Sequence, residues 1–398
     1  MRAFLYRIYQ FIMYLAAQVV TWKDARLVEG EHSIMKVPTI IRELGYERVL
    51  MVTDRNITKL GLTEGLLKEL KENSVECVVF DGTVPNPTID NIEDALKLYG
   101  ENNCQALIAF GGGSVMDCAK GVGARVARPN RSISQMRGFL KVMKTIPCLI
   151  AIPTTAGTGS ETTIAAVVAN PRTHEKYAIN DFHLVPKYAV LDPLITVNLP
   201  QPITSTTGLD ALTHAVEAYI GRSNTRATRA SARESVRLIH ENLYKAYSDG
   251  KDVAARANML KASFLAGSAF TRAYVGYVHA LAHTLGGFYG VPHGLANAVL
   301  LPHVLEYFGS AAHKPLAELA NLIGIAKAGD STAQKANHFI KWIRELEAKM
   351  SIPTRIDGIR EEDLPGMIRN ALKESNPTYP VPRELFAEDF RKLYDMIR

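Results

Sequence analysis

The chain has 398 residues, of which 47% are hydrophobic and 22% are charged. This composition is typical of a soluble globular protein, and the length predicts two domains because one hydrophobic core rarely organises so many residues. The formal net charge is +6, but the 46 basic and 40 acidic residues are interspersed, which argues against a nucleic-acid-binding arm. The four cysteines form no C-x-x-C pair and indicate reduced thiols of a cytoplasmic protein.

Residues 1–28 are predicted to form an N-terminal extension that contains an amphipathic helix. Apolar side chains recur there at helical spacing, at Leu5, Ile8, Ile12, Leu15 and Val19. The longest apolar run, residues 11–20, is too short to span a bilayer, and no signal-peptide cleavage site follows it. We therefore expect neither a membrane span nor export. The helix is expected to pack on the protein body or on a second subunit, and docking on a membrane surface is the alternative.

Residues 29–200 are predicted to form a parallel α/β domain. Short runs rich in Val, Ile, Leu and Phe at 47–53, 75–80, 105–110 and 147–153 are typical of strands. Between them, residues 59–73, 88–100 and 114–127 carry helical apolar spacing. Almost continuously apolar strands that alternate with helices indicate a parallel sheet covered on both faces. The segment GVGA at 121–124 is expected to end its helix.

The loops after these strands carry the polar residues, and ligands of parallel α/β domains bind at the carboxyl ends of strands. The run 111–114, GGGS, lets the backbone approach a pyrophosphate at a helix N-terminus. Residues 154–161, TTAGTGSE, offer neutral donors to phosphate or ribose oxygens. Asp54 ends the first strand, where a carboxylate accepts hydrogen bonds from a ribose diol and favours NAD over NADP, or caps a helix. Asn86 fits either a turn or a polar contact.

Residues 201–398 are predicted to form an all-α domain, because strand signals nearly vanish past Leu199-Pro200. We place the domain boundary between residues 195 and 205.

A divalent-metal site is predicted in this helical half. Asp210 and His214 lie four residues apart on one helix face, and His279 and His293 lie in helix-compatible segments rich in glycine. Only 11 histidines occur in the chain, and those at 279, 283, 293 and 303 fall within one mostly apolar stretch. Burying these imidazoles without a common partner is costly, which favours a metal ion. Ligands of this kind suit Fe(II), Zn(II) or Mn(II) without choosing among them.

Four segments in this order resemble the iron-containing, or group III, alcohol dehydrogenases. They are GGGSVMDCAK (111–120), PTTAGTGSE (153–161), TGLDALTHAVEAY (207–219) and HALAHTLGGFYGVPHG (279–294). The resemblance covers about residue 28 to the C-terminus. It implies a Rossmann-like N-terminal domain, a helical C-terminal domain, and Fe(II) held by Asp210, His214, His279 and His293.

The same resemblance implies further site residues. His283, one turn after His279, matches a histidine near the catalytic metal and is the expected proton relay or a residue that orients the site. The positions that align with the cofactor cleft are Asp54, Asn86, Gly112, Gly113, Ser114, Asp117, Thr154, Thr155, Thr158 and Lys176.

The chain departs from the family pattern where the substrate pocket is expected. The segment from Phe270 to Gly276 contains Arg272 and Tyr274, where the family usually has small or amide residues. We expect Phe270, Arg272 and Tyr274 to line the pocket, with Phe270 and Tyr274 on one helical face that leads to His279.

The predicted activity is NAD-dependent, iron-dependent oxidation of an alcohol or reduction of an aldehyde, with hydride passing between substrate and nicotinamide. NADP as cofactor, and zinc or manganese as metal, are alternatives. Two other enzyme classes are alternatives: a zinc-dependent polyol dehydrogenase of the glycerol type, and a carbon-oxygen lyase of the dehydroquinate synthase type, which has a similar two-domain plan. The enzyme is expected to be a cytoplasmic homo-oligomer, a dimer or larger, whose partners are small alcohols or aldehydes rather than nucleic acids or membranes.

Overall fold

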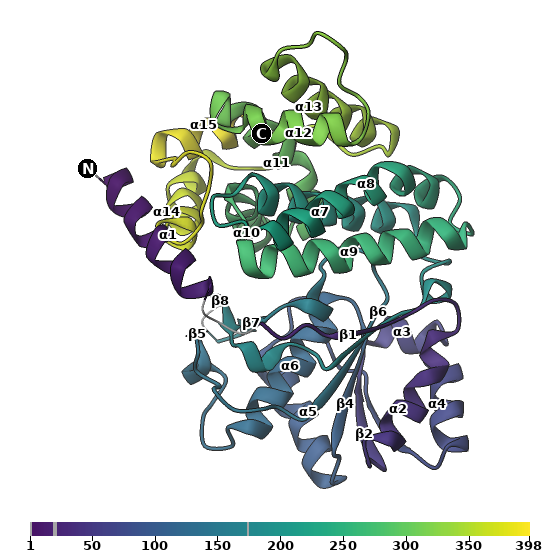
Figure 1. The fold of residues 1–398 in the computed structure, drawn as a ribbon. Coiled ribbons are helices and arrows are strands. Elements are labelled where there is room, and N and C mark those ends of the chain that lie inside the picture. The colour runs from purple at the N-terminus through teal and green to yellow at the C-terminus, as the bar shows by residue number, and fades with distance from the viewer. Residues whose placement is uncertain (1, 19–21, 173–174) are drawn as a thin grey trace. The chain divides into compact units, whose positions relative to one another are not determined.

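The computed structural model describes residues 2–18, 22–172 and 175–398. Its contacts divide the chain into two compact units (Figure 1). One is residues 22–198, and the other is residues 199–398 together with the N-terminal helix α1 (Arg2–Gln18). Every strand formed by described residues lies in the first unit. The predicted fold class, an α/β domain followed by a helical domain, is confirmed.

The first unit is built on a six-stranded parallel sheet with the order β1-β9-β6-β4-β2-β3. Four of its strands match the predicted runs, namely β2 (Arg48–Val52), β3 (Glu76–Phe80), β4 (Ala106–Gly111) and β6 (Cys148–Pro153). The other two, β1 (Arg26–Glu29) and β9 (Tyr188–Leu191), are short strands that pair with each other and were not predicted.

Both faces of this sheet are buried, which explains the almost continuous apolar character of its strands. Alternate residues of β2 and β4 point to opposite faces, so Leu50 and Leu107 join one core while Met51 and Ile108 join the other. The first core is completed by α5 (Ile89–Glu101) and α6 (Gly113–Ala127), and the second by α2 (Val37–Glu43) and α4 (Glu64–Glu72). The short α3 (Arg55–Lys59) follows β2.

Two features of this unit differ from the prediction. Strands β5 (Gly138–Phe139), β7 (Ala165–Asn170) and β8 (Glu175–Asn180) form a separate three-stranded sheet, which was not predicted. The segment GVGA does not end α6, which continues to Ala127. A Cβ atom on Gly121 would lie 2.5 Å from Ile92 Cδ1, so this glycine allows α6 to approach α5 closely.

The second unit packs around a buried helix, α7 (Gln201–Ile220), which contacts α8 (Arg226–Ser248), α9 (Val253–Ala273) and α11 (His293–Phe308). The remaining helices are α10 (Tyr277–Tyr289), α12 (Ser310–Leu322), α13 (Thr332–Lys349), α14 (Leu364–Ser375) and α15 (Ala387–Ile397). Among the described residues, no helix is long and apolar enough to cross a membrane.

Helix α1 packs on this unit, as predicted for the protein body, and the contact is made by its polar side rather than by its apolar stripe. Gln10 is 5% exposed, and Leu5, Ile8, Ile12 and Leu15 are each between 43% and 58% exposed. Val19, the last residue of the predicted stripe, lies outside the described residues. The expected packing of this helix on the protein body is thus observed, and hydrogen bonds to backbone carbonyls far along the chain, rather than burial of the apolar stripe, attach it.

Candidate metal centre and cofactor loops

The two glycine- and threonine-rich loops of the α/β unit lie against each other. Gly112 caps α6, so the first amides of this helix stand at the carboxyl end of β4. A Cβ atom on Gly113 would lie 2.9 Å from Thr158 Cγ2, and one on Gly112 would lie 3.5 Å from Thr155 Oγ1. The backbone N–H of Thr154 donates to the carbonyl of Gly111 at 3.1 Å. Any side chain larger than hydrogen at Gly113 would therefore push the second loop away.

Two more of the predicted cofactor residues flank these loops. The exposed Asn86 has a positive φ of 56°, and its backbone N–H donates to Ser114 Oγ at 3.2 Å. Asp54 lies two residues after β2 and caps α3, where its Oδ1 accepts from the backbone N–H groups of Asn56 and Ile57. Lys176 is exposed on β8 of the small sheet. Polar groups therefore gather at the carboxyl ends of the strands, where a phosphate-bearing cofactor could bind. The contacts of each residue with the cofactor stay predictions.

A buried lysine that the sequence interpretation missed supports the second loop. Lys120 is fully buried, and its ammonium donates to the carbonyls of Ser160, Thr163 and Ala165 and to two hydroxyls. Burial lowers its pKa to about 8, against the opposing effects of Asp117 and Glu161. Asp117, predicted to contact the cofactor, accepts from Ser160 Oγ and from the backbone N–H of Val167. Both side chains hold the loop in place.

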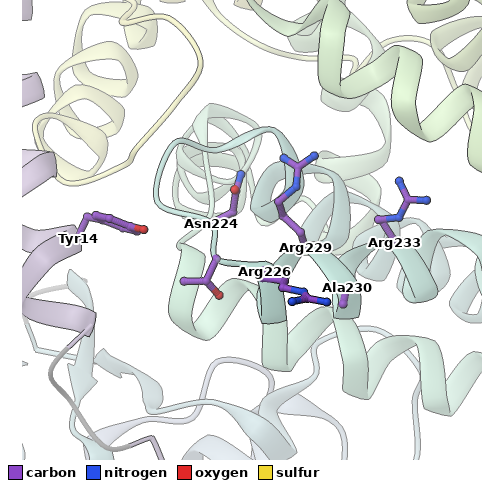
Figure 2. A pocket seen from close by; sticks show the side chains of 7 residues that line it. Tyr14, Asn224, Arg226, Arg229, Ala230 and Arg233 are labelled. Atoms are coloured by element: carbon purple, nitrogen blue, oxygen red, sulfur yellow. The ribbon is translucent and has the colours of Figure 1, made fainter.

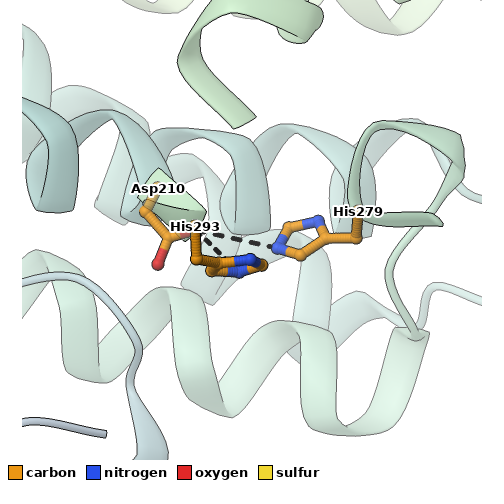
Figure 3. Close-up of side chains that lie close together, drawn as sticks. All are labelled: Asp210, His279 and His293. Atoms are coloured by element: carbon orange, nitrogen blue, oxygen red, sulfur yellow. Dashed lines mark ion pairs between the residues drawn. The ribbon is translucent and has the colours of Figure 1, made fainter. Parts of the chain in front are cut away.

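Three of the four predicted metal ligands converge in the helical unit (Figure 3). Asp210 lies on α7, His279 on α10, and His293 is the first residue of α11. Asp210 Oδ1 is 3.8 Å from His279 Nε2 and 3.5 Å from His293 Nε2, and the three atoms lie within 4.8 Å of one another. Burial, together with the neighbouring histidines, holds the pKa of His279 well below its usual value. A neutral imidazole keeps the lone pair that metal binding requires.

An amide fills the point where these atoms converge. Asn297 Nδ2 lies 2.7 Å from Asp210 Oδ1 and 3.1 Å from the Nε2 atoms of both His279 and His293. Three acceptors directed at one buried point repel one another unless a donor or a cation stands between them. Asn297 supplies that donor here, and the same three acceptors fit a divalent ion, which would take the place of the Asn297 amide group.

His214, the fourth predicted ligand, lies beside this group. Its ring stacks on that of His279 with centroids 4.4 Å apart, and on Phe270 with centroids 4.1 Å apart. The structure does not bring a His214 nitrogen within 4.8 Å of all three other ligand atoms. Ligation by His214 stays a prediction, and Phe270 is placed against a predicted ligand, as expected of a pocket residue.

Glu217 orients His279 and was not recognised from the sequence. Its Oε2 accepts from His279 Nδ1 at 2.6 Å, which directs Nε2 toward Asp210. The backbone N–H groups of Gly276 and Val278 also donate to this carboxylate. Burial raises the pKa of Glu217 to about 7, although hydrogen bonds from the backbone of Gly276, Val278 and His279 oppose the rise. The available signal was its position on α7, seven residues after Asp210 and therefore on nearly the same face.

A second, partly exposed network contains His283, the predicted catalytic residue. His283 Nδ1 lies 2.7 Å from Glu374 Oε1, and the Tyr379 hydroxyl donates to the same oxygen at 2.7 Å. The His283 ring stacks on that of His293 with centroids 5.2 Å apart. Burial acts to raise the pKa of Glu374, but His283 and the hydrogen bonds outweigh it and the pKa is lowered. Neither Glu374 nor Tyr379 was singled out from the sequence.

The helical face expected to carry the substrate pocket is interrupted. Helix α9 ends at Ala273, and Tyr274 follows with a φ of 65°, so Phe270 and Tyr274 do not continue one face to His279. Burial and the neighbouring Tyr9 of α1 raise the pKa of Tyr274. The premise was wrong because the segment Tyr274–Gly276 turns the chain between two helices. Arg272 remains on the last turn of α9, and its role in the pocket stays a prediction.

Sequence comparisons match both units. The iron-containing alcohol dehydrogenase model matches residues 24–193, and the C-terminal model of the same family matches residues 204–397. The chain belongs to the iron-containing alcohol dehydrogenase family. It is thus an oxidoreductase that acts on CH–OH groups. The lyase alternative has no support from these matches.

Individual members of the family are similar over most of their length. A 1,3-propanediol dehydrogenase of Citrobacter freundii is 39% identical over 92% of this chain and 96% of that protein. A crystal structure of a 1,3-propanediol oxidoreductase superposes with a TM-score of 0.90 at 36% identity, covering 94% of this chain and 99% of the other. A sulfoacetaldehyde reductase of Bifidobacterium kashiwanohense in complex with NAD+ has a TM-score of 0.84 at 26% identity, covering 94% and 98%.

Proposed function

We propose that this enzyme interconverts short primary alcohols, 1,3-propanediol among them, and their aldehydes with NAD and Fe(II). The observation that carries the proposal is the convergence of one carboxylate and two neutral imidazoles on a single buried point. The substrate class rests on the similarity to 1,3-propanediol dehydrogenases, and the choice of NAD rests on Asp54 and on the NAD+ complex of a related reductase. The enzyme is further proposed to be a cytoplasmic homo-oligomer.

Asp210, His279 and His293 would hold the metal ion, with His214 beside them as the fourth ligand. A bound divalent ion supplies Lewis acidity that favours loss of the proton from the alcohol oxygen. Glu217 fixes the ring of His279 through Nδ1, which keeps Nε2 free of hydrogen and directed at the site. The stacked Phe270 restricts rotation of His214 and contributes an apolar wall that excludes water.

The cofactor loops belong to the other unit and position the nicotinamide nucleotide. Gly112 and Gly113 allow the pyrophosphate to approach the N-terminus of α6, and the hydroxyls of Thr154, Thr155 and Thr158 supply neutral donors. Asp54 would accept the ribose hydroxyls and repel a 2′-phosphate. The protein thereby contributes orientation, and the cofactor accepts the hydride.

His283 is proposed to move the alcohol proton toward solvent. Its side chain is 42% exposed, while its Nδ1 bonds to Glu374 and its ring stacks on His293. This position joins the metal site to water. Because Glu374 stabilises a protonated imidazole, His283 can take up a proton and release it without leaving its place.

The metal assignment is tested with enzyme purified under anaerobic conditions. After chelation, NADH formation on 1,3-propanediol should vanish and should return when Fe(II) is added. His293→Ala should lower metal content and activity by more than about 100-fold, since it removes a direct ligand. His338→Ala, on a histidine that pairs with Asp330 on the surface, is the matched control and should retain both. Full activity of His293→Ala without metal would refute the proposal.

A further inference from the structure

Helix α1 is attached to the helical unit by polar contacts on one side. The Arg7 guanidinium donates to the carbonyls of Val381 and Pro382 and pairs with Glu384 at 2.5 Å. The Gln10 amide donates to the carbonyls of Pro377 and Tyr379 at 3.1 and 2.9 Å. These bonds reach a segment more than 360 residues away in the sequence. They fix which side of α1 faces the protein and which side faces outward.

Among the described side chains of α1, residues 4–15, those on the outward side are apolar or aromatic. These residues are between 40% and 68% exposed, and they are Phe4, Leu5, Ile8, Tyr9, Phe11, Ile12 and Leu15. Spacings of three, four and seven residues place them on one broad arc of the helix. The sequence from residue 1 to residue 22 contains no acidic residue. A continuous apolar surface of this kind marks an interaction site rather than ordinary surface.

An arginine-rich pocket adjoins this helix (Figure 2). It has a volume of about 640 Å³ and is lined by Tyr14 of α1 together with Asn224, Thr225, Arg226, Arg229, Ala230 and Arg233. Residues 218–233 contain four arginines and no acidic residue. Arg229 pairs with Glu318, whereas Arg226 is exposed and forms no ion pair with any residue that the structure describes. The surface beside α1 is therefore positive and complementary to an anionic surface.

We propose that α1 and the arginine pocket dock this enzyme on the surface of an anionic lipid bilayer. Phe and Tyr side chains of α1 would enter the boundary between head groups and acyl chains, with the helix lying in the plane of the membrane. Arg226 and its neighbours would contact anionic head groups. In an isolated interfacial helix the polar side faces water. In this protein the polar side of α1 instead contacts the protein body, through Arg7 and Gln10.

A second copy of the chain fits this surface less well than a bilayer. A helix of 17 residues is about 25 Å long and about 10 Å wide, so its footprint is roughly 250 Å². A stable protein interface buries about 800 Å² on each partner.

Flotation with lipid vesicles tests the proposal, using the full chain with a tag at its C-terminus. Vesicles of phosphatidylcholine containing phosphatidylglycerol should bind the enzyme at low salt, and vesicles of phosphatidylcholine alone should not. Phe4→Gln/Phe11→Gln should reduce binding at least tenfold, and Arg226→Gln about fivefold. Leu60→Gln, on an equally exposed leucine of the other unit, and Lys245→Gln, at the far end of α8, should bind as the wild type does.

Two further measurements distinguish loss of membrane binding from misfolding of a variant and from loss of self-association. Unchanged dehydrogenase activity shows that each variant is folded, because none of these residues belongs to the proposed metal or cofactor sites. Mass in solution, from light scattering, should be the same for the wild type and Phe4→Gln/Phe11→Gln. The proposal is overturned if wild-type enzyme fails to bind anionic vesicles at low salt or if the control variants lose binding equally. A smaller mass of the double variant without vesicle binding would show instead that a second copy covers α1.

Discussion

At the scale of single residues, the metal centre depends on side chains that are not ligands. Glu217 accepts three hydrogen bonds in a buried position, from His279 and from two backbone amides. Asn297 bonds to the carboxylate and to both imidazoles. Glu217 restricts the ring of His279, so the direction of its Nε2 atom is set before any ion binds, whereas an ion would replace the Asn297 amide.

Glu217→Gln tests this pre-organisation. Glutamine offers one acceptor oxygen, so its amide NH₂ must face a backbone or imidazole N–H that donates to the carboxylate in the wild type. We expect metal affinity to fall about 10- to 100-fold, whereas NAD affinity, measured by nucleotide fluorescence, should not change. Glu306→Gln, which removes only an exposed ion pair with Arg344, is the control. Equal metal affinity of Glu217→Gln and the wild type would show that His279 needs no such support.

The sequence could predict the candidate ligands that the structure brings together, but not the residues that orient them. Aspartate and histidine are scarce in apolar surroundings, so Asp210, His279 and His293 stand out by residue type alone. Glu217 and Glu374 become recognisable only when α7, α10 and α14 are placed together, since their partners lie 62 and 91 residues away. The same limitation applies to α1, where periodicity reveals an apolar stripe but not the distant carbonyls that bind its polar side.

At the scale of helices and strands, the strands with both faces buried were predicted from the sequence, whereas the strand at the sheet edge was not. Strands β2, β3, β4 and β6 carry continuous apolar runs because both of their faces are covered. Strand β1 has the sequence RLVE and lies at the sheet edge, where pairing with β9 outweighs a weak local preference. The glycines of α6 were misread as a helix end because close helix packing leaves no local sequence signal.

Replacing either of two glycines in neighbouring helices with alanine should have opposite effects on the stability of the protein. A Cβ atom on Gly294, next to His293, would lie 2.4 Å from the backbone oxygen of Thr206 on α7, which cannot move without displacing that helix. Gly294→Ala should therefore lower the unfolding temperature and the metal affinity. Gly287, inside α10, has open space at its Cβ position, and Gly287→Ala should stabilise the protein by about 0.5–1 kcal/mol. Thermal unfolding of both variants checks the pair, and a stable Gly294→Ala enzyme would contradict the close approach of α7 and α11.

A buried glutamate of helix α13, Glu347, should make the stability of the protein depend on pH. Glu347 is 8% exposed and its Oε1 has no hydrogen-bond partner among the described residues; burial raises its pKa to about 8 from 4.5, although Arg344 opposes the rise. Between these two values the folded protein binds more protons than the unfolded chain, so this group lowers stability as pH rises. Glu347→Gln should raise the unfolding temperature at pH 8 and change it much less at pH 4.5. Parallel curves for the two proteins across this range would show that Glu347 does not titrate with the expected pKa.

At the scale of the whole molecule, the metal ion and the cofactor are proposed to bind residues of different compact units. Asp210, His279 and His293 join α7, α10 and α11 of the helical unit, and the cofactor loops belong to residues 22–198. A ligand that binds only the folded state stabilises the elements that hold it. Each ligand should therefore protect its own unit.

Hydrogen exchange measured with each ligand separately checks this division. Fe(II) or Zn(II) alone should slow amide exchange in α7, α10 and the start of α11, because one ion links three helices that otherwise open independently. NAD alone should slow exchange at residues 111–116 and 154–161, where amides and hydroxyls are proposed to face the nucleotide. His293→Ala should abolish the metal effect and leave the NAD effect intact, and Gly113→Ala, which moves Thr158, should do the reverse. Protection by NAD centred on α10 and α11 would contradict the assignment of the cofactor to the α/β unit.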